Sequence, residues 1–556
     1  MTELLDGGVE ASAGLAVYGA EAAEATPARA SLVADRMPER LAAKDPTLWG
    51  PEAEEVAKVR LGWVDTFRRS RDLLPQLAEL KAELADLDHV VLAGMGGSSL
   101  APEVIARTLD VPLTVLDTTD PHQVRRAMFG AAEDASGAAD LLRRTVVVVS
   151  SKSGSTVETD SHRRAYWQAF LDAGLTEAEA ARHIVVVTDP GSPLESTARQ
   201  MGAFVVLADP EVGGRYSALT AFGLVPTALA GVDVVELLDQ AEALSESLPR
   251  DTDNPSLALG AALGAAAAAG RDKLALISDG TGIEGLGDWA EQLIAESTGK
   301  AGKGIVPVVV EAPDAPIAKA DDVLTITVGG ALPPGSVPGG GVSPDLAVNG
   351  PLGAHFLAWE YATAIASRII GVEPFDQPNV AESKENTNRI LAEGLPAEAP
   401  SFTEGAVEVY APGEAGDTVS GVLRWLADQV SDTGYLAVMA YLDRFGDAAA
   451  AELRPLLATA SGRPVTFGWA PRFLHSTGQY HKGGPQVAAF LQLTGAVTDD
   501  LPVPGRPYTF GELIAAQAAG DRQALAGRRR PLVRLHVTDR AAGLAQLRDA
   551  AASLRG

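Results

Sequence analysis

A run of hydroxyl side chains with one lysine is the segment of this sequence best suited to bind an anion. Ser151-Lys152-Ser153-Gly154-Ser155-Thr156 follows a Val-rich run and precedes a helical pattern. Four hydroxyls and a lysine at the start of a helix offer a phosphate group side-chain donors and free backbone N–H groups. The segment lacks the longer glycine loop and the Gly-Lys-Ser/Thr ending of a nucleotide P-loop. A solvated serine-rich loop with Thr156 as helix cap is the alternative.

Two glycine-rich turns could bring further donors close to a ligand. Gly94-Met95-Gly96-Gly97-Ser98-Ser99 follows an apolar run, but Ser99 stands where a dinucleotide fingerprint has its third glycine. In Gly213-Gly214-Arg215-Tyr216-Ser217, the two glycines allow the backbone and the guanidinium group to approach an oxyanion. A tight turn without a ligand and a surface ion pair are the respective alternatives.

Three other segments carry groups that can move protons. Glu296 stands just beyond an apolar helix, where it is either a half-buried base or part of a solvated helix end, in the segment Gln292-Leu293-Ile294-Ala295-Glu296-Ser297-Thr298-Gly299-Lys300. Phe375-Asp376-Gln377-Pro378-Asn379-Val380-Ala381-Glu382-Ser383-Lys384 predicts a helix start with a distal lysine, for which capping is the simpler explanation. His475-Ser476-Thr477-Gly478-Gln479-Tyr480-His481-Lys482-Gly483-Gly484 holds two of the eight histidines, which are proton carriers near pH 7 or loop residues without function.

The overall charge limits the partners of this chain. It has 556 residues, with 45 Lys and Arg against 73 Asp and Glu, a formal charge of −28 that repels nucleic acid and anionic membranes. An anionic metabolite therefore needs a local cluster of positive groups. The sequence has no cysteine, which excludes disulfides and thiolate chemistry. Residues 1–30 lack a signal-peptide pattern and the near-apolar run Leu257–Gly270 is short, so we expect a cytoplasmic protein with Leu257–Gly270 as a buried helix.

These motifs must be positioned by alternating strands and helices. Apolar, β-branched runs predict strands, and amphipathic stretches between them predict helices such as Thr156–Asp172, Gly287–Ala295 and Leu352–Ile370. Strands separated by helices are typical of parallel sheets. Gly329–Gly350 and Gly394–Gly416 are rich in Gly and Pro and are interpreted as a long loop and a separator. The predicted strands are His89–Ala93, Thr145–Ser150, His183–Thr188, Phe204–Ala208, Lys273–Ser278, Gly304–Glu311, Val323–Val328, Tyr435–Tyr441, Val465–Gly468 and Leu532–Val537.

Taken together, the motifs resemble those of the phosphoglucose isomerase family. The resemblance runs from about Ala93 to Glu385, with a weaker match near His475–Gly484. It implies an α/β fold with two SIS-type (sugar isomerase) doubly wound parallel-sheet domains, followed here by a C-terminal α/β segment. The predicted domains are a helical segment at 1–60, SIS-type domains at 61–253 and 254–394, and a C-terminal α/β domain at 395–556.

The resemblance also implies roles for individual residues. Glu296 would be the base that moves a proton between C2 and C1, and Arg215 would stabilise the enediolate. Lys384 and a histidine would open the sugar ring, and Gln292 and Gln377 would line the sugar site. The sugar phosphate would contact Gly97, Ser98, Ser151, Lys152, Ser153, Thr156 and Gly214. No metal and no cofactor is expected.

The identity of the ring-opening histidine departs from the family pattern. The family places it in a Gly-Gln-His motif between the glutamate segment and the second signature, where this chain has only His355 in a helical pattern. The second signature is altered as well, since Asn379-Val380-Ala381-Glu382-Ser383-Lys384 replaces Gly-Val-Glu-x-x-Lys. The later segment resembles the isomerase half of fused transaldolase/isomerase proteins. We expect His481 rather than His475 to act, with His475 lining the substrate site.

The resulting hypothesis is an isomerase that interconverts glucose 6-phosphate and fructose 6-phosphate. The alternatives are a SIS-type sugar-phosphate sensor without catalysis and an isomerase that also accepts mannose 6-phosphate. The sequence leaves open whether the C-terminal segment supplies its histidine within one chain or across a homodimer, or has only a structural role.

Overall fold

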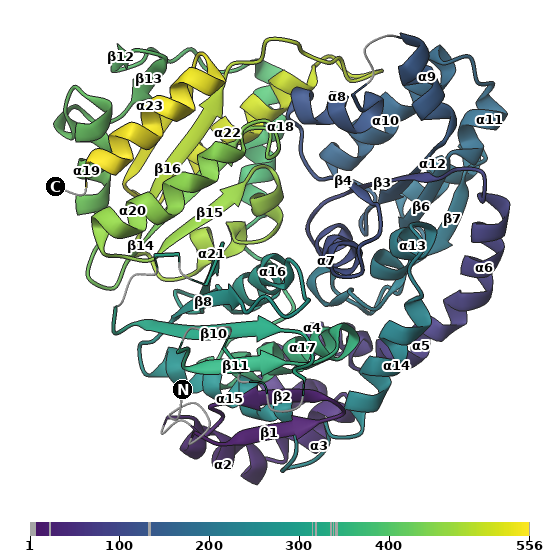
Figure 1. Ribbon diagram of the computed structural model, residues 1–556, viewed down its shortest axis with the longest axis vertical. Helices are drawn as coiled ribbons and strands as arrows, with labels where there is room; N and C mark the ends of the chain where they lie inside the picture. Colours follow the sequence, from purple (N-terminus) through teal and green to yellow (C-terminus); the bar gives the residue numbers. More distant parts are fainter. Residues whose placement is uncertain are drawn as a thin grey trace.

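The described part of the chain contains three β-sheets, each covered by helices (Figure 1). This computed structural model describes residues 7–554, apart from 22–23, 132–134, 314, 317–319, 334–335, 337 and 340–342. The α/β class with parallel sheets that the sequence predicts is confirmed. The domain limits at residues 61, 254 and 395 stay predictions.

The first sheet has five parallel strands in the order β4-β3-β5-β6-β7. Its central strand is buried along its whole length because consecutive side chains enter cores on opposite faces: Val146 and Val148 on one, Val147 and Val149 on the other. Its strands are β3 (His89–Gly94), β4 (Thr114–Leu116), β5 (Thr145–Ser150), β6 (Ile184–Thr188) and β7 (Phe204–Leu207). One face packs on α6 (Leu74–Glu83), α7 (Leu100–Thr108) and α13 (Ala221–Leu229); the other packs on α8 (Pro121–Phe129), α10 (Val157–Asp172), α11 (Glu177–Arg182) and α12 (Pro193–Met201).

The second sheet corrects two expectations. Its order is β1-β2-β11-β10-β8-β9, and a hairpin of β1 (Val9–Ser12) and β2 (Leu15–Tyr18) extends it by antiparallel pairing with β11 (Leu346–Asn349). The segment predicted to be helical over 1–60 therefore also contains strands, and of that segment residues 1–6 and 22–23 lie outside the described residues. β11 forms inside the stretch expected to be a loop, several residues of which also lie outside the described part. The other elements are β8 (Lys273–Ser278), β9 (Val306–Val310), β10 (Val323–Gly329), α2 (Ala25–Ala34), α3 (Met37–Ala42), α14 (Val234–Ser245), α15 (Pro255–Ala268), α16 (Leu286–Thr298) and α17 (Leu352–Ile370).

The third sheet belongs to the C-terminal segment and has the order β12-β13-β17-β16-β14-β15. The strands expected at 435–441 and 532–537 form with those bounds, whereas β16 between them was missed, as were the short β12 and β13. The elements are β12 (Phe402–Glu404), β13 (Val407–Tyr410), β14 (Tyr435–Tyr441), β15 (Val465–Trp469), β16 (Ala488–Gly495), β17 (Leu532–Val537), α19 (Val419–Asp428), α20 (Leu453–Ser461), α21 (Gly478–Gly483), α22 (Phe510–Ala526) and α23 (Arg540–Ser553).

Helix α16 lies where the three sheets with their helices approach one another (Figure 1). It contacts α7, which packs on the first sheet, and α21 of the C-terminal segment. Helix α18 (Ala381–Glu393) packs along α22. The motifs at 94–99, 292–300, 375–384 and 475–484 lie on or beside α7, α16, α18 and α21, and the hydroxyl loop 151–156 precedes α10. Residues far apart in the chain are thereby brought to one place.

Candidate active site

Glu296 is a buried carboxylate with three side-chain donors around one of its oxygens. It lies in the last turn of α16 and is 2% exposed. Its Oε2 accepts hydrogen bonds from Gln377 Nε2 at 2.9 Å, Arg215 Nη1 at 3.3 Å and Gln292 Nε2 at 3.5 Å. Burial raises the pKa of Glu296, and the positive charge of Arg215 only partly opposes this. A carboxylate with a raised pKa in a polar, buried setting is suited to exchange protons.

Two cations hold the turn that carries Gln377. Arg215 donates from Nη2 to the carbonyl oxygens of Pro374 and Asp376 at 2.5 and 3.0 Å. Lys300 donates from Nζ to the carboxylate of Asp376 at 2.5 Å. Because Arg215 also donates from Nε to Ser297 Oγ at 2.9 Å, it ties the turn to α16. Arg215 and Gln377, from two other motifs, thus contact Glu296, and Lys300 holds the turn that carries Gln377.

The glycines of the two turns permit close packing of chain segments. A Cβ atom at Gly97 would collide with the carbonyl of Gly214, and one at Gly96 would lie 2.7 Å from the carbonyl oxygen of His475. The missing side chain of Gly97 thus makes room for the Gly214 backbone, and the predicted contact of Gly97 with the substrate stays a prediction. Gly214 itself has open space beyond its Cα atom.

This difference between the two glycines gives a matched stability prediction. We expect Gly97→Ala to lower the free energy of unfolding by about 1–3 kcal/mol, because the backbone must shift to admit the methyl group. The control Gly214→Ala should change it by less than about 0.5 kcal/mol. Urea unfolding of both variants measures this, and equal losses would contradict the packing argument.

The serine-rich loop places four hydroxyl side chains at the start of α10. Ser151 Oγ lies 3.0 Å from Thr156 Oγ1, and Ser153 Oγ lies 2.9 Å from Ser155 Oγ. Thr156 occupies the N-cap position of α10 without using its side chain to cap the helix. The loop therefore combines polar side chains with the N–H groups of a helix start, as an anion site requires.

Lys152 does not join these hydroxyls, in contrast to the sequence expectation for its side chain. Its Nζ donates to Asp189 Oδ2 at 2.6 Å and to the carbonyl oxygen of Asp209 at 3.4 Å. Burial lowers the pKa of Lys152, although the hydrogen bond and the negative charge of Asp189 act to raise it. Its ammonium group thus holds the loop against neighbouring turns.

His475 lies beside the loop and is held by a buried carboxylate. Its Nε2 is 2.9 Å from Glu158 Oε1, which also accepts from Gln517 Nε2 at 2.8 Å. Burial by itself would raise the pKa of Glu158, but the interaction with His475 brings it down to about 2. The carbonyl oxygen of His475 accepts from Gln292 Nε2 at 2.7 Å, so a single amide links His475 to Glu296.

A cavity of about 320 Å³ joins His475 to the hydroxyl loop and to Lys384. Lys384 comes from α18 and is exposed, and its charge contributes to the low pKa of Glu158. We call this space the loop cavity. Its polar lining consists of Ser153, Ser155, Thr156, Glu158, Ser383, Lys384, Thr387, Asn388, His475, Lys482 and Gln517.

His481 does not line the loop cavity. The sequence analysis preferred it to His475 as the ring-opening group, but the structure brings His475 to the hydroxyl loop instead. His481 is buried, its Nδ1 is 2.8 Å from the hydroxyl of Tyr435, and its ring stacks on that tyrosine. Burial among aromatic rings lowers the pKa of His481 to about 3. Phe473 and Phe490 contact it edge-on. These contacts give His481 a place in the core.

Sequence reasoning missed two residues of this group, Glu158 and Gln517. An acidic residue in the first turn of a helix is ordinary, so Glu158 carried no distinctive signal beyond its position two residues after Thr156. Gln517 lies within α22 of the C-terminal segment and has no motif around it.

In the described ranges, no group of three or more His, Asp or Glu side chains is arranged to hold a metal ion. Among the helices described, none combines the length and apolar character that crossing a membrane requires.

The central part of the chain is similar to proteins that are already known. Residues 80–311 match the family model described as phosphoglucose isomerase. A probable glucose-6-phosphate isomerase of Haloarcula marismortui is 36% identical over 230 residues, 41% of this chain and 50% of that protein. A glucose-6-phosphate isomerase of Rubrobacter xylanophilus is 35% identical over 228 residues, 40% and 52% of the two chains. The matched region thus spans about half the length of these relatives.

Solved structures agree with this placement at the level of the fold. A glucose-6-phosphate isomerase of Chlamydia trachomatis superimposes with a TM-score of 0.55 at 19% identity, covering 71% of this chain and 92% of that one. A hypothetical protein of Thermus thermophilus gives a TM-score of 0.51 at 24% identity, covering 66% and 94%. Residues 80–311, which carry the hydroxyl loop, Arg215 and Glu296, are therefore similar to the phosphoglucose isomerase family.

Proposed function

We propose that this protein is a glucose-6-phosphate isomerase (EC 5.3.1.9) that interconverts glucose 6-phosphate and fructose 6-phosphate in glycolysis and gluconeogenesis. The observation that carries the proposal is the convergence of Arg215, Gln292 and Gln377 on the buried carboxylate of Glu296. Gln292 connects this group to His475 beside the hydroxyl loop. The names of the relatives support the same reaction.

The substrate's phosphate is proposed to bind at the loop 151–156, with Ser98 and the N-terminus of α10 nearby. The sugar would then extend through the loop cavity towards Gln292 and Gln377. The negative charge of the whole chain makes such a local anchor necessary, since it repels a sugar phosphate at longer range.

Ring opening is assigned to His475 and Lys384, which line the same cavity. His475 is proposed to exchange a proton with the ring oxygen or the C1 hydroxyl, and its hydrogen bond with Glu158 fixes the orientation of its ring. All of these groups come from one chain, so the proposal has the C-terminal segment supply the histidine without a partner subunit.

Isomerisation is assigned to Glu296. Its carboxylate takes the C2 proton of the open-chain aldose, which gives a cis-enediolate. The same group returns this proton to C1, and the proton of the C2 hydroxyl passes to the C1 oxygen, which gives the ketose. Negative charge develops on the enediolate oxygens, and the buried guanidinium of Arg215 is a preorganised counter-charge for it. The net change is the movement of hydrogen within one molecule, so no redox partner is consumed. Because sugar phosphates are too highly charged to cross a lipid bilayer unaided, the proposal includes a cytoplasmic location.

A coupled assay tests the function. Purified protein is mixed with fructose 6-phosphate and with glucose-6-phosphate dehydrogenase to report product, in the presence of EDTA. Turnover that survives the chelator supports the proposed isomerase. Tight binding of fructose 6-phosphate without turnover would favour the sensor instead, and mannose 6-phosphate tested in the same way probes a wider substrate range.

The pH profile of kcat provides a further prediction. Since burial raises the pKa of Glu296, activity should fall with decreasing pH at a midpoint above the value of about 4.3 for an ordinary glutamate. Arg215 lowers the pKa of Glu296, so Arg215→Gln should move this midpoint to still higher pH, whatever its effect on the maximum rate. A midpoint that moves down in Arg215→Gln would contradict the assignment.

A further inference from the structure

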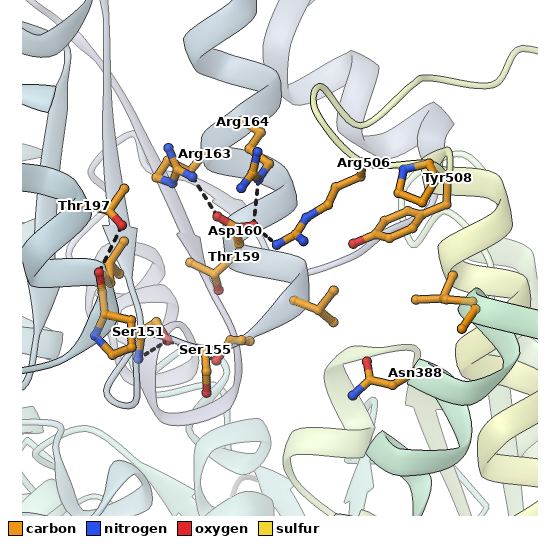
Figure 2. Close-up of a pocket in the computed structure, with 18 residues that line it drawn as sticks. Ser151, Ser155, Thr159, Asp160, Arg163, Arg164, Thr197, Asn388, Arg506 and Tyr508 are labelled. Carbon is orange, nitrogen blue, oxygen red and sulfur yellow. Dashed lines mark hydrogen bonds and ion pairs between the residues drawn. The ribbon is translucent and has the colours of Figure 1, made fainter. Parts of the chain in front are cut away.

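A second cavity, of about 660 Å³, adjoins the hydroxyl loop and gathers three arginines (Figure 2). It is bounded by α10, the first residues of α12, the later part of α18 and the segment 506–508 before α22. Figure 2 shows the guanidinium groups of Arg163, Arg164 and Arg506 converging on Asp160. We call this space the arginine cavity.

The charge of the arginine cavity is opposite to that of the chain. Asp160 accepts from Arg163 Nη2 and Arg164 Nε at 2.7 Å each and from Arg506 Nη2 at 2.8 Å. It is the only acidic side chain among the described residues that line the space, against three arginines. The lining therefore has an excess of two positive charges in a chain whose formal charge is −28. A local excess of this kind attracts multiply charged anions.

Two buried donors of the lining have no partner in the described structure. These are Arg163 Nε and Thr159 Oγ1, and the Arg163 side chain is only 9% exposed. A buried donor left unpaired costs free energy that a hydrogen-bond acceptor in the cavity would recover. The oxygens of a phosphate are strong acceptors, and guanidinium groups bind them in bidentate geometry.

A purely structural role explains only part of this arrangement. Arg164 Nη1 donates to the carbonyl oxygen of Pro504 at 3.3 Å, so the arginines also attach the segment before α22 to α10. That attachment accounts neither for a cavity within the size range of ligand sites nor for the unpaired donors of two residues that line it.

The arginine cavity adjoins the loop cavity without coinciding with it. Ser155, Thr156, Val157 and Asn388 line both spaces. Ser151 and Gly154 of the hydroxyl loop line only the arginine cavity, whereas Ser153, Lys384 and His475 line only the loop cavity. Helix α10 presents Glu158 to one space and Asp160 to the other. A ligand in each cavity would therefore contact the same helix.

We propose that the arginine cavity is a second anion site, which binds a phosphate-bearing metabolite with at least two negative charges, separate from the sugar phosphate assigned to the loop cavity. This proposal goes beyond the proposed isomerisation, and its test measures the binding of an anion rather than turnover. Because two anions on one helix repel each other, occupancy of this site should weaken the binding of fructose 6-phosphate.

Calorimetric titration of the full chain with inorganic pyrophosphate at low ionic strength tests the proposal. We expect binding that persists at saturating fructose 6-phosphate and that Arg164→Gln/Arg506→Gln weakens about tenfold or more. Arg506→Gln alone should show a smaller loss in the same direction. Arg199→Gln is the matched control, since this arginine of α12 pairs with Glu195 outside the cavity lining. It should bind pyrophosphate like the unchanged protein.

Three results would overturn the proposal. These are no binding of millimolar pyrophosphate, equal affinity in the double-arginine variant, and loss of binding in Ser153→Ala but not in the arginine variants. Unchanged binding of fructose 6-phosphate by the arginine variants would show that they are folded. If the coupled assay shows no turnover while pyrophosphate still binds through the arginines, the isomerase proposal fails and this one stands.

Discussion

Replacing Glu296 by glutamine is expected to lower kcat by a factor on the order of 10²–10⁴, the usual contribution of a general base. The amide has nearly the same shape and still offers an oxygen to Gln377 Nε2, but it cannot accept the C2 proton. Fructose 6-phosphate should bind with little change, because the phosphate is anchored at the loop 151–156. The coupled assay gives kcat, and calorimetry of the variant with fructose 6-phosphate gives binding.

Glu291 provides a matched control on the same helix. It contacts Ser476 Oγ at 3.3 Å, and burial raises its pKa to about 8, so it is largely uncharged at neutral pH. Glu291→Gln should therefore leave kcat close to that of the unchanged protein. Near-normal turnover in Glu296→Gln would refute the base assignment. An equal loss in both variants would mean that the effect comes from disturbing α16.

The second large effect concerns the two histidines. We expect His475→Gln to lower kcat about 100-fold or more, since the amide can still donate to Glu158 but cannot carry a proton at neutral pH. Its stability should change little, because the His475 side chain is partly exposed at 18%. The assay uses the equilibrium mixture of ring-closed fructose 6-phosphate, so that ring opening is part of the measured turnover.

His481→Ala should instead lower the stability of the protein and leave kcat unchanged. Loss of the buried ring and of its contact with the Tyr435 hydroxyl is expected to lower the free energy of unfolding by about 2–4 kcal/mol, with kcat per folded molecule retained. Urea unfolding and the coupled assay on the same samples separate the two effects. If His481→Ala instead abolished turnover in a stable protein, and His475→Gln did not, His481 would be the ring-opening histidine, as the sequence suggested.

Much of the fold could be predicted from local pattern. The strands at 145–150, 273–278, 435–441 and 532–537 and the helix at 352–370 form with the bounds that the sequence indicated. Central parallel strands are apolar throughout because both faces are covered, and this signal is strong. Short or edge strands such as β1, β11 and β12 were missed, since a few residues stabilised by pairing with a distant strand carry little local signal.

For the candidate site, the sequence by itself determined the motif residues and their spacing. Ser151-Lys152-Ser153-Gly154-Ser155-Thr156, Arg215, Glu296 and Gln377 lie in segments whose residue types restrict the chemistry open to them. Gln292 and Glu296 are four residues apart on α16, where Gln292 Nε2 donates to Glu296 Oε2 at 3.5 Å.

Only the tertiary structure decided which side chains meet. In the structure, the ammonium group of Lys152 donates to Asp189. His475, not His481, lies beside the hydroxyl loop. Glu158 contacts His475 and also accepts a hydrogen bond from Gln517. The physical reason is that hydrogen bonds and burial depend on distances between segments hundreds of residues apart. Those distances are set by how α10, α16 and α22 pack, and no spacing along the chain contains them.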